Sequence, residues 1–179
     1  NQYLFQKPGD YLIIVKFGSQ TLQSPLHVVE IEQNELKAYE TFGSDKFTLL
    51  FLENNRSKPN SSLLEICRTT SAAFPKTKCS QYCAGYLAIS AFKEALAKNN
   101  VTGGTEVYSP IAAKLDHCVS LFDANSFYVD QLLFYEVYAL ALAKQHDKAL
   151  AVIKSIRKIA PWTVLAQQLG NELRGMESE

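Results

Sequence analysis

The cysteines are the residues of this chain with the clearest chemical potential. Cys67, Cys79, Cys83 and Cys118 are four in number, in a sequence of 179 residues that contains one Met. An even number of cysteines favours disulfide pairing, and disulfides persist in oxidising compartments. The alternative is four ordinary buried thiols, because free cysteines pack as small hydrophobic residues.

The order of the helices expected around the cysteines indicates how they would pair. If the segments on either side of Lys76 form an antiparallel helical hairpin, Cys67 lies opposite Cys83, and Cys79 faces the region of Cys118. We therefore predict the disulfides Cys67–Cys83 and Cys79–Cys118. A bridge from Cys79 to Cys83 would be strained, because side chains four residues apart in a helix lie stacked rather than opposed.

Catalytic and metal-binding arrangements are not evident in the sequence. Asp116-His117-Cys118 has the residue types of a thiol nucleophile, but adjacent helical residues diverge by about 100°. His27 and Glu30 are three apart on an expected strand and face opposite sides. The spacing Cys-x3-Cys does not match common structural zinc sites, and no phosphate loop, nucleophile elbow or zinc helix is present. We predict no catalytic residue, no metal and no other cofactor.

The composition restricts the class of partner and the compartment. The chain has 18 basic and 18 acidic residues and no net charge, which argues against nucleic acid, and no apolar run reaches the length of a membrane span, roughly 18 residues. Sequons begin at Asn55, Asn60 and Asn100 and permit glycosylation in a eukaryotic host. The cysteines favour an extracytoplasmic location: secreted, periplasmic or at the cell surface.

A change of hydrophobic period near Asn34 defines the architecture. The segments 11–17 and 26–32 are rich in β-branched and aromatic residues that suit a β-hairpin, whereas apolar residues beyond Leu36 recur at helical steps. We predict a β-hairpin over residues 1–33 and a helical domain over 34–179.

The helical part is divided by capping residues and prolines. Ser62 and Glu65 form a capping box that opens a helix, and Ser109-Pro110 provides a hydroxyl cap followed by a proline at the first helical position. Helices are predicted over 62–74, 79–98, a segment after Ser109, 126–144, 148–160 and 162–173, with breaks at Pro75, 145–147 and Pro161. This pattern predicts a mainly α fold of antiparallel helical hairpins with an N-terminal β-hairpin.

Two family resemblances add to this pattern. The stretch 138–150, with Ala139, Ala141 and Ala143 at close-approach positions and Ile159-Ala-Pro161 after it, resembles one tetratricopeptide repeat, which implies a bundle or short solenoid of helical hairpins.

The N-terminal part resembles a different family. Phe5-Gln-Lys-Pro-Gly-Asp-Tyr11 and the Ser24-Pro25 step are similar to the openings of the last two strands of immunoglobulin-like domains in bacterial surface proteins. The resemblance implies that residues 1–33 are a remnant of such a sandwich; the alternative is a simple hairpin docked on the helices.

Three tyrosines are the candidate binding residues. Tyr128, Tyr135 and Tyr138 share one helical face, where they would line a groove for a peptide or protein; the alternative is that they are core residues. We predict an extracytoplasmic protein- or peptide-binding helical module without catalytic activity. The alternative is an enzyme or small-ligand-binding domain with scattered site residues in a helical cleft.

The strand 11–17 is also a candidate for self-association. It carries Leu12, Ile13, Ile14 and Val15 with one charged residue, and such a strand requires cover. If the helices shield only one face, a second copy or the rest of a larger protein is expected to cover the other.

Overall fold

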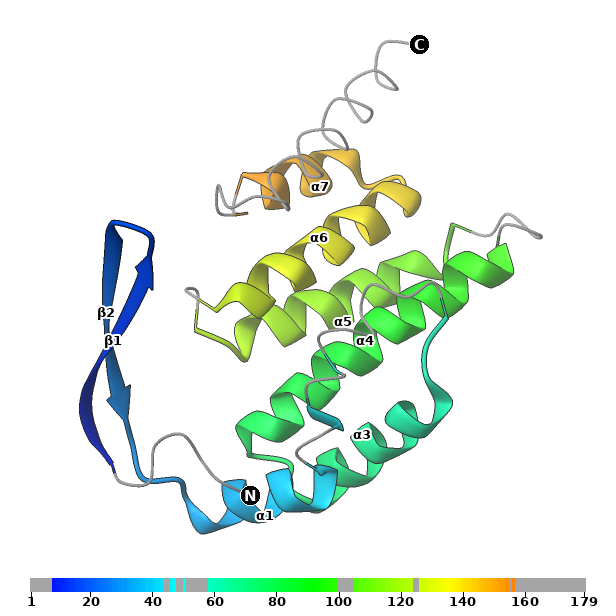
Figure 1. Ribbon diagram of the computed structural model, residues 1–179. Coiled ribbons are helices and arrows are strands. Elements are labelled where there is room, and N and C mark those ends of the chain that lie inside the picture. The colour runs from blue at the N-terminus through cyan, green and yellow to red at the C-terminus, as the bar shows by residue number, and fades with distance from the viewer. Residues whose placement is uncertain are drawn as a thin grey trace.

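The fold is mainly helical with an N-terminal antiparallel β-hairpin, as predicted (Figure 1). The computed structural model describes residues 8–43, 46–47, 50, 58–99, 105–123, 126–154 and 156. The helix predicted at 162–173, Pro161 and the sequons at Asn55 and Asn100 lie outside these residues. The elements are β1 (Gly9–Phe17), β2 (Gln20–Val28), α1 (Gln33–Phe42), α3 (Ser61–Ala73), α4 (Lys78–Asn99), α5 (Tyr108–Ser120), α6 (Phe127–Leu142) and α7 (His146–Ile153).

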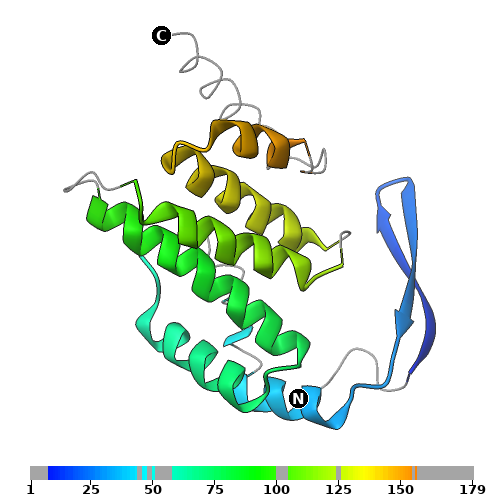
Figure 2. The same ribbon diagram turned by 180° about the vertical axis from the view of Figure 1, so that it is seen from behind.

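The helices from α3 to α7 stack in sequence order. Each packs mainly on the helix before it and the helix after it, and α1 packs across α3 and α4 (Figures 1 and 2). Short connections of a few residues favour such antiparallel neighbours. The long helix α4 joins the two parts of the stack, because it packs against α1 and α3 and also against α5 and α6.

Two clusters of buried side chains hold this stack together. The N-terminal core consists of Ala38, Phe42, Leu50, Leu63, Leu64, Cys67, Cys79, Cys83 and Tyr86. The C-terminal core includes Ile89, Phe92, Tyr108, Leu115, Cys118, Tyr128, Leu132, Val137 and Leu140. Tyr82 of α4 packs against both clusters and so connects them.

The β-hairpin closes through a turn that the sequence prediction missed. Gly18 has φ +58° and begins a two-residue turn, so that Phe17 pairs with Gln20 and Gly9 with Val28. A glycine with positive φ at the first central position suits a type II′ turn. The second strand therefore begins at Gln20, and the prediction that it spans 26–32 is wrong.

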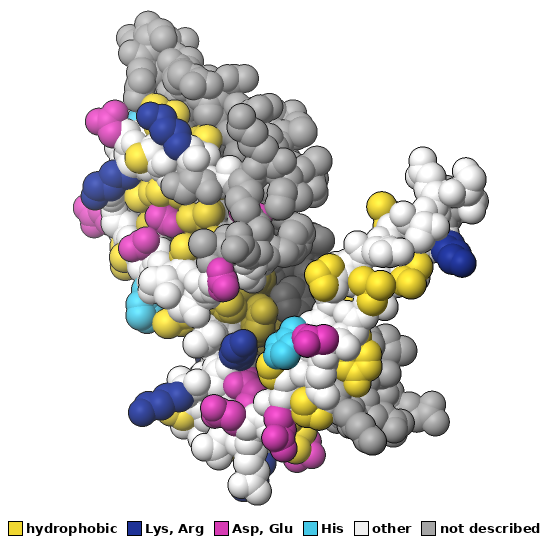
Figure 3. Space-filling model, turned by 90° about the vertical axis from the view of Figure 1, so that its left-hand side faces the viewer, with side chains coloured by type: hydrophobic (Ala, Val, Ile, Leu, Met, Phe, Trp, Pro, Cys, Tyr) yellow, Lys and Arg dark blue, Asp and Glu magenta, His cyan; other side chains and the backbone are white. Residues whose placement is uncertain are grey.

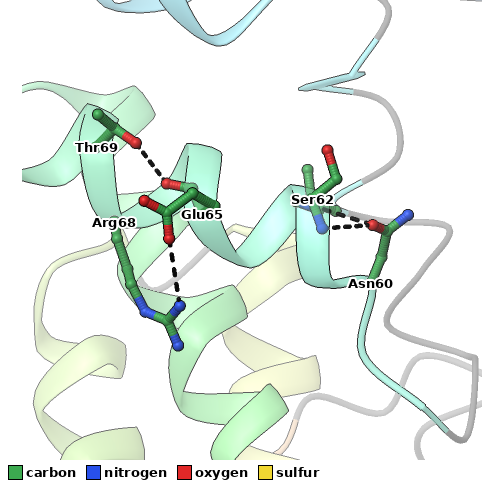
Figure 4. A network of polar contacts seen from close by, with 6 residues as sticks. Asn60, Ser62, Glu65, Arg68 and Thr69 are labelled. Carbon is green, nitrogen blue, oxygen red and sulfur yellow. Dashed lines mark hydrogen bonds and ion pairs between the residues drawn. The ribbon is translucent and has the colours of Figure 1, made fainter.

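The start of α3 is capped differently from the prediction. The side-chain oxygen of Asn60 accepts hydrogen bonds from the backbone N–H groups of Ser62 and Leu63, at 3.0 and 3.2 Å (Figure 4). Glu65 contacts Arg68 at 3.6 Å instead of reaching back to the helix start. The capping box of Ser62 and Glu65 is therefore wrong, because an asparagine two residues earlier already satisfies the free amides.

The start of α5 also lies earlier than predicted. The helix begins at Tyr108, and the Ser109 hydroxyl accepts a hydrogen bond from the Gln145 side chain at 2.6 Å instead of capping the helix. Pro110 still falls in the first turn, where no intrahelical amide bond is required of it.

The turn between α6 and α7 lies two residues earlier than predicted. It spans residues 143–145, whereas the predicted break was 145–147. Lys144 has φ +58°, and α7 begins at His146. A left-handed residue at the end of a helix accommodates the reversal of the chain.

Candidate functional site

A hollow between α5, α6 and α7 is lined by a buried carboxyl group, that of Glu136. Its volume is about 570 Å³, within the range of natural ligand pockets. We call it the Glu136 hollow. It is lined by Ser109, Ala112, Ala113, Asp116, Glu136, Leu140, Gln145, Lys148, Ala151 and Val152.

Glu136 is a buried carboxyl group without a partner on one oxygen. Its side chain is 6% exposed, and its Oε2 atom is buried with no hydrogen-bond partner among the described residues. Burial, and to a smaller extent the negative charge of Asp116, together raise the pKa of Glu136 to about 7. At neutral pH this carboxyl therefore exchanges between its charged and neutral forms.

The position of α6 in the stack explains why Glu136 is buried. The helix lies between α5 and α7 and is apolar on nearly all sides, as the sequence predicts for a helix covered by neighbours. Glu136 interrupts this apolar helix directly before Val137. Glu136 was not among the residues predicted from the sequence, although a carboxylate inside an apolar helix is a recognisable signal of a buried polar group.

A short hydrogen-bonded chain forms one side of the Glu136 hollow. Lys148 donates from Nζ to the Gln145 side-chain oxygen at 2.9 Å, and Gln145 donates to the Ser109 hydroxyl at 2.6 Å. Through these bonds Gln145 links the start of α5 to α7. The ammonium group of Lys148 bonds to Gln145, and no ion pair joins Glu136 to a cation among the described residues.

The predicted binding tyrosines lie in the C-terminal core and not in the Glu136 hollow. Tyr128 is 2% exposed and donates from its hydroxyl to the Tyr82 carbonyl at 3.4 Å. The rings of Tyr135 and Tyr138 are half-buried and lie 5.6 and 5.5 Å from the ring of Phe92. Burial raises the pKa of Tyr135 to about 12. The geometry matches the alternative considered above, in which these tyrosines pack as core residues.

The four cysteines are free and buried, and three of them lie together. The thiol of Cys83 hydrogen-bonds with those of Cys67 and Cys79 in the N-terminal core. The bond to Cys83 is the largest cause of the raised pKa of Cys79, and the bond to Cys67 is the largest cause of the raised pKa of Cys83. The predicted partners Cys67 and Cys83 are thus in contact. Cys118 instead packs in the C-terminal core, so a bridge from Cys79 to Cys118 requires a rearrangement.

A second hollow lies beside Cys118. It has a volume of about 530 Å³ and a mostly apolar lining, which consists of Ala84, Leu87, Ala88, Ala91, Ala113, Lys114, His117 and Cys118. Burial raises the pKa of Cys118 to about 11, so that it is a neutral thiol at physiological pH, unlike a reactive cysteine. Asp116 lines the Glu136 hollow and His117 lines this one. Asp116 therefore diverges from the other two residues as predicted, whereas His117 and Cys118 line the same hollow.

Two further findings concern metals and membranes. Within the described ranges, no three His, Cys, Asp or Glu side chains lie close enough to hold a metal ion. None of the described helices combines the length and the apolar composition needed to cross a lipid bilayer.

The chain was compared with protein families, curated proteins and solved structures. The resemblances to tetratricopeptide repeats and immunoglobulin-like domains rest on the sequence motifs alone. No family model, no curated protein and no solved structure matches the chain.

Proposed function

We propose that this chain is a protein- or peptide-binding helical module, and that the Glu136 hollow receives a lysine or arginine side chain of the partner. The observation that supports this proposal is the buried, unpartnered Oε2 atom of Glu136 in a hollow at the surface of the stack.

The physical reason is the unfavourable free energy of an unpaired buried carboxylate. Such a group either takes up a proton or acquires a cation that replaces its lost hydration. In the free chain the raised pKa of Glu136 reflects the first solution. A guanidinium or ammonium group from a partner supplies the second, and the exposed carboxylate of Asp116 adds attraction at the edge of the hollow.

We further infer an extracytoplasmic setting and no nucleic-acid partner. The setting is supported by the even number of cysteines and by the contact between Cys67 and Cys83, which would join without a large movement. The balance of 18 basic and 18 acidic residues supports a partner other than nucleic acid.

A small cationic ligand is the second candidate occupant. The volume of about 570 Å³ also fits a free amine or guanidine compound, and two carboxyl groups, those of Asp116 and Glu136, line the hollow. Affinity distinguishes the two candidates: a module for proteins binds a basic peptide far more tightly than free arginine, whereas a small-molecule site binds the free compound as tightly as the peptide.

The experiment is a selection from a random peptide library on the purified chain, with removal of peptides that bind Glu136→Gln equally well. We expect the retained peptides to share one lysine or arginine and to lose at least about tenfold in affinity when citrulline replaces that arginine. Glu94→Gln, at an exposed position of α4, is the matched control and leaves the affinity unchanged. Retained peptides that share no basic residue would contradict the proposal.

A further inference from the structure

We propose that β1 pairs edge to edge with β1 of a second copy of this chain, antiparallel and centred on Ile13, to form a four-stranded sheet. This inference concerns the hairpin and is independent of the Glu136 hollow.

No described helix covers the hydrophobic side chains of β1. Leu12, Ile13, Ile14 and Val15 are 56%, 40%, 51% and 53% exposed. The hairpin stands apart from the helices in Figure 1, and Figure 3 shows a row of hydrophobic side chains along it. A two-stranded hairpin is marginally stable alone in water, and three or more strands are needed for independent stability.

The two edges of the hairpin differ in their hydrogen-bonding groups. In a two-residue hairpin the pair next to the turn exchanges backbone hydrogen bonds, and every second pair along the ladder does the same. Phe17 and Gln20 form that pair, so alternate residues of β1 direct their N–H and C=O groups outward. On β2 the outward set includes Pro25, which has no N–H. The outward residues of β1 are Asp10, Leu12, Ile14 and Lys16, all of which retain the N–H.

The charges of β1 select the register of the pairing. Centred on Ile13, antiparallel pairing places Leu12 opposite Ile14 and Asp10 opposite Lys16 of the second copy, once on each side of the twofold axis. Asp10 and Lys16 are the two charged residues of β1, so this register compensates every charge of the strand. It also overlaps the whole strand from Gly9 to Phe17.

Other registers leave both charges without an opposite charge on the facing strand. Outward residues pair only with outward residues, so the register changes in steps of two, and either step places both Asp10 and Lys16 opposite uncharged residues. Asp10 contacts the His27 ring of its own hairpin through Oδ1, at 2.5 Å, and its second oxygen is available to Lys16 of the second copy. A self-complementary strand of this kind fits a second copy of the same chain.

Charge exchange in the full chain tests the pairing. Sedimentation velocity should give a dimer that dissociates on dilution. Asp10→Lys and Lys16→Asp each place like charges opposite one another twice and should weaken the dimer about tenfold or more. The double variant Asp10→Lys/Lys16→Asp restores opposite charges and should recover the wild-type dimer. A monomer for the wild type at about 100 µM, or a double variant no better than the single ones, would overturn the proposal.

Cysteine cross-linking tests the register itself. Ile13 lies opposite its own copy in a pair without hydrogen bonds, where the Cα atoms are about 4.5 Å apart and a disulfide is feasible. Mild oxidation of Ile13→Cys should therefore give a covalent dimer, resolved on a non-reducing gel. The control Ile14→Cys, opposite Leu12, should remain monomeric on the same gel, and the four native cysteines are buried. Equal cross-linking of the two variants would overturn the register.

Discussion

Gly85 of α4 lies directly against the ring of Tyr128 of α6. A Cβ atom at Gly85 would be 2.5 Å from Cε1 and 2.8 Å from the hydroxyl oxygen of Tyr128. Helices that are not consecutive in the chain therefore approach closely at this point, and the absence of a side chain at Gly85 permits the contact. The relationship explains why Tyr128 packs in the core.

Gly85→Ala should destabilise the protein by about 1–3 kcal/mol, because the added methyl group overpacks this contact. Urea denaturation measures the change. The double variant Gly85→Ala/Tyr128→Leu relieves the clash, so its loss should be smaller than the sum of the two single losses. If Gly85→Ala instead stabilised the chain by about 1 kcal/mol, as expected for an open helical position, the close contact would be contradicted.

Glu35 should contribute to stability through the start of α4. Its two carboxylate oxygens accept hydrogen bonds from the backbone N–H groups of Lys78 and Cys79, at 2.7 and 2.8 Å, and so join α1 to α4. We expect Glu35→Ala to lower the free energy of unfolding by about 1–3 kcal/mol, because it leaves these two amides without the carboxylate. The exposed Glu40 of the same helix is the control, and Glu40→Ala should change stability by less than about 0.5 kcal/mol. Equal effects of the two substitutions would contradict this role.

Stability should fall as the pH rises through about 7 because of Glu136. The pKa is about 7 in the folded chain against a reference value of 4.5, so the folded state binds the proton more tightly than the unfolded state. The resulting stabilisation is complete below about pH 4.5 and is lost as the pH rises through about 7. Glu136→Gln lacks this titration, so above pH 8 it should be more stable than the wild type by about 1–3 kcal/mol.

Thermal denaturation of both proteins between pH 4 and pH 9 checks this prediction. Asp116→Asn is a useful companion variant, because removal of its charge should lower the pKa of Glu136 and shift the loss of stability to lower pH. A constant difference between the wild type and Glu136→Gln across the pH range would contradict the burial of an unpaired carboxyl.

Removal of residues 1–30 should leave a folded helical domain. The strands β1 and β2 pack mainly against each other, while the helices have their own two clusters of buried side chains. We expect circular dichroism to show a helical, cooperatively melting remainder with a melting temperature within a few degrees of the full chain. Loss of the helical signal would show that the hairpin is an integral part of the core.

The sequence predicted those parts of the fold that depend on local pattern. The change of period near Asn34 and the prolines defined the hairpin and the main helices, with α4 found at Lys78–Asn99 against a prediction of 79–98. At Ser62 the prediction failed because the neighbouring Asn60 caps the helix, and at Ser109 it failed because the helix begins earlier and the hydroxyl accepts a hydrogen bond from Gln145. Only the three-dimensional structure shows that distant Gln145 bonds to Ser109.

The candidate site was less predictable for the same reason. The tyrosines were correctly placed on one helix, but whether they face solvent depends on helices far apart in the chain, such as the one that carries Phe92. The Glu136 hollow forms from three separate helices, so no local motif marks it.

The most direct test of the proposed function is the titration of the Glu136 carboxyl group, followed by carbon NMR with Glu136→Gln for assignment. We predict a midpoint near pH 7 in the free chain, and a midpoint displaced toward lower pH when Nα-acetyl-arginine methylamide is added. The citrulline analogue, which has the same shape without the charge, should leave the midpoint unchanged. A midpoint at the ordinary glutamate value in the free chain, or the same response to both compounds, would contradict the account.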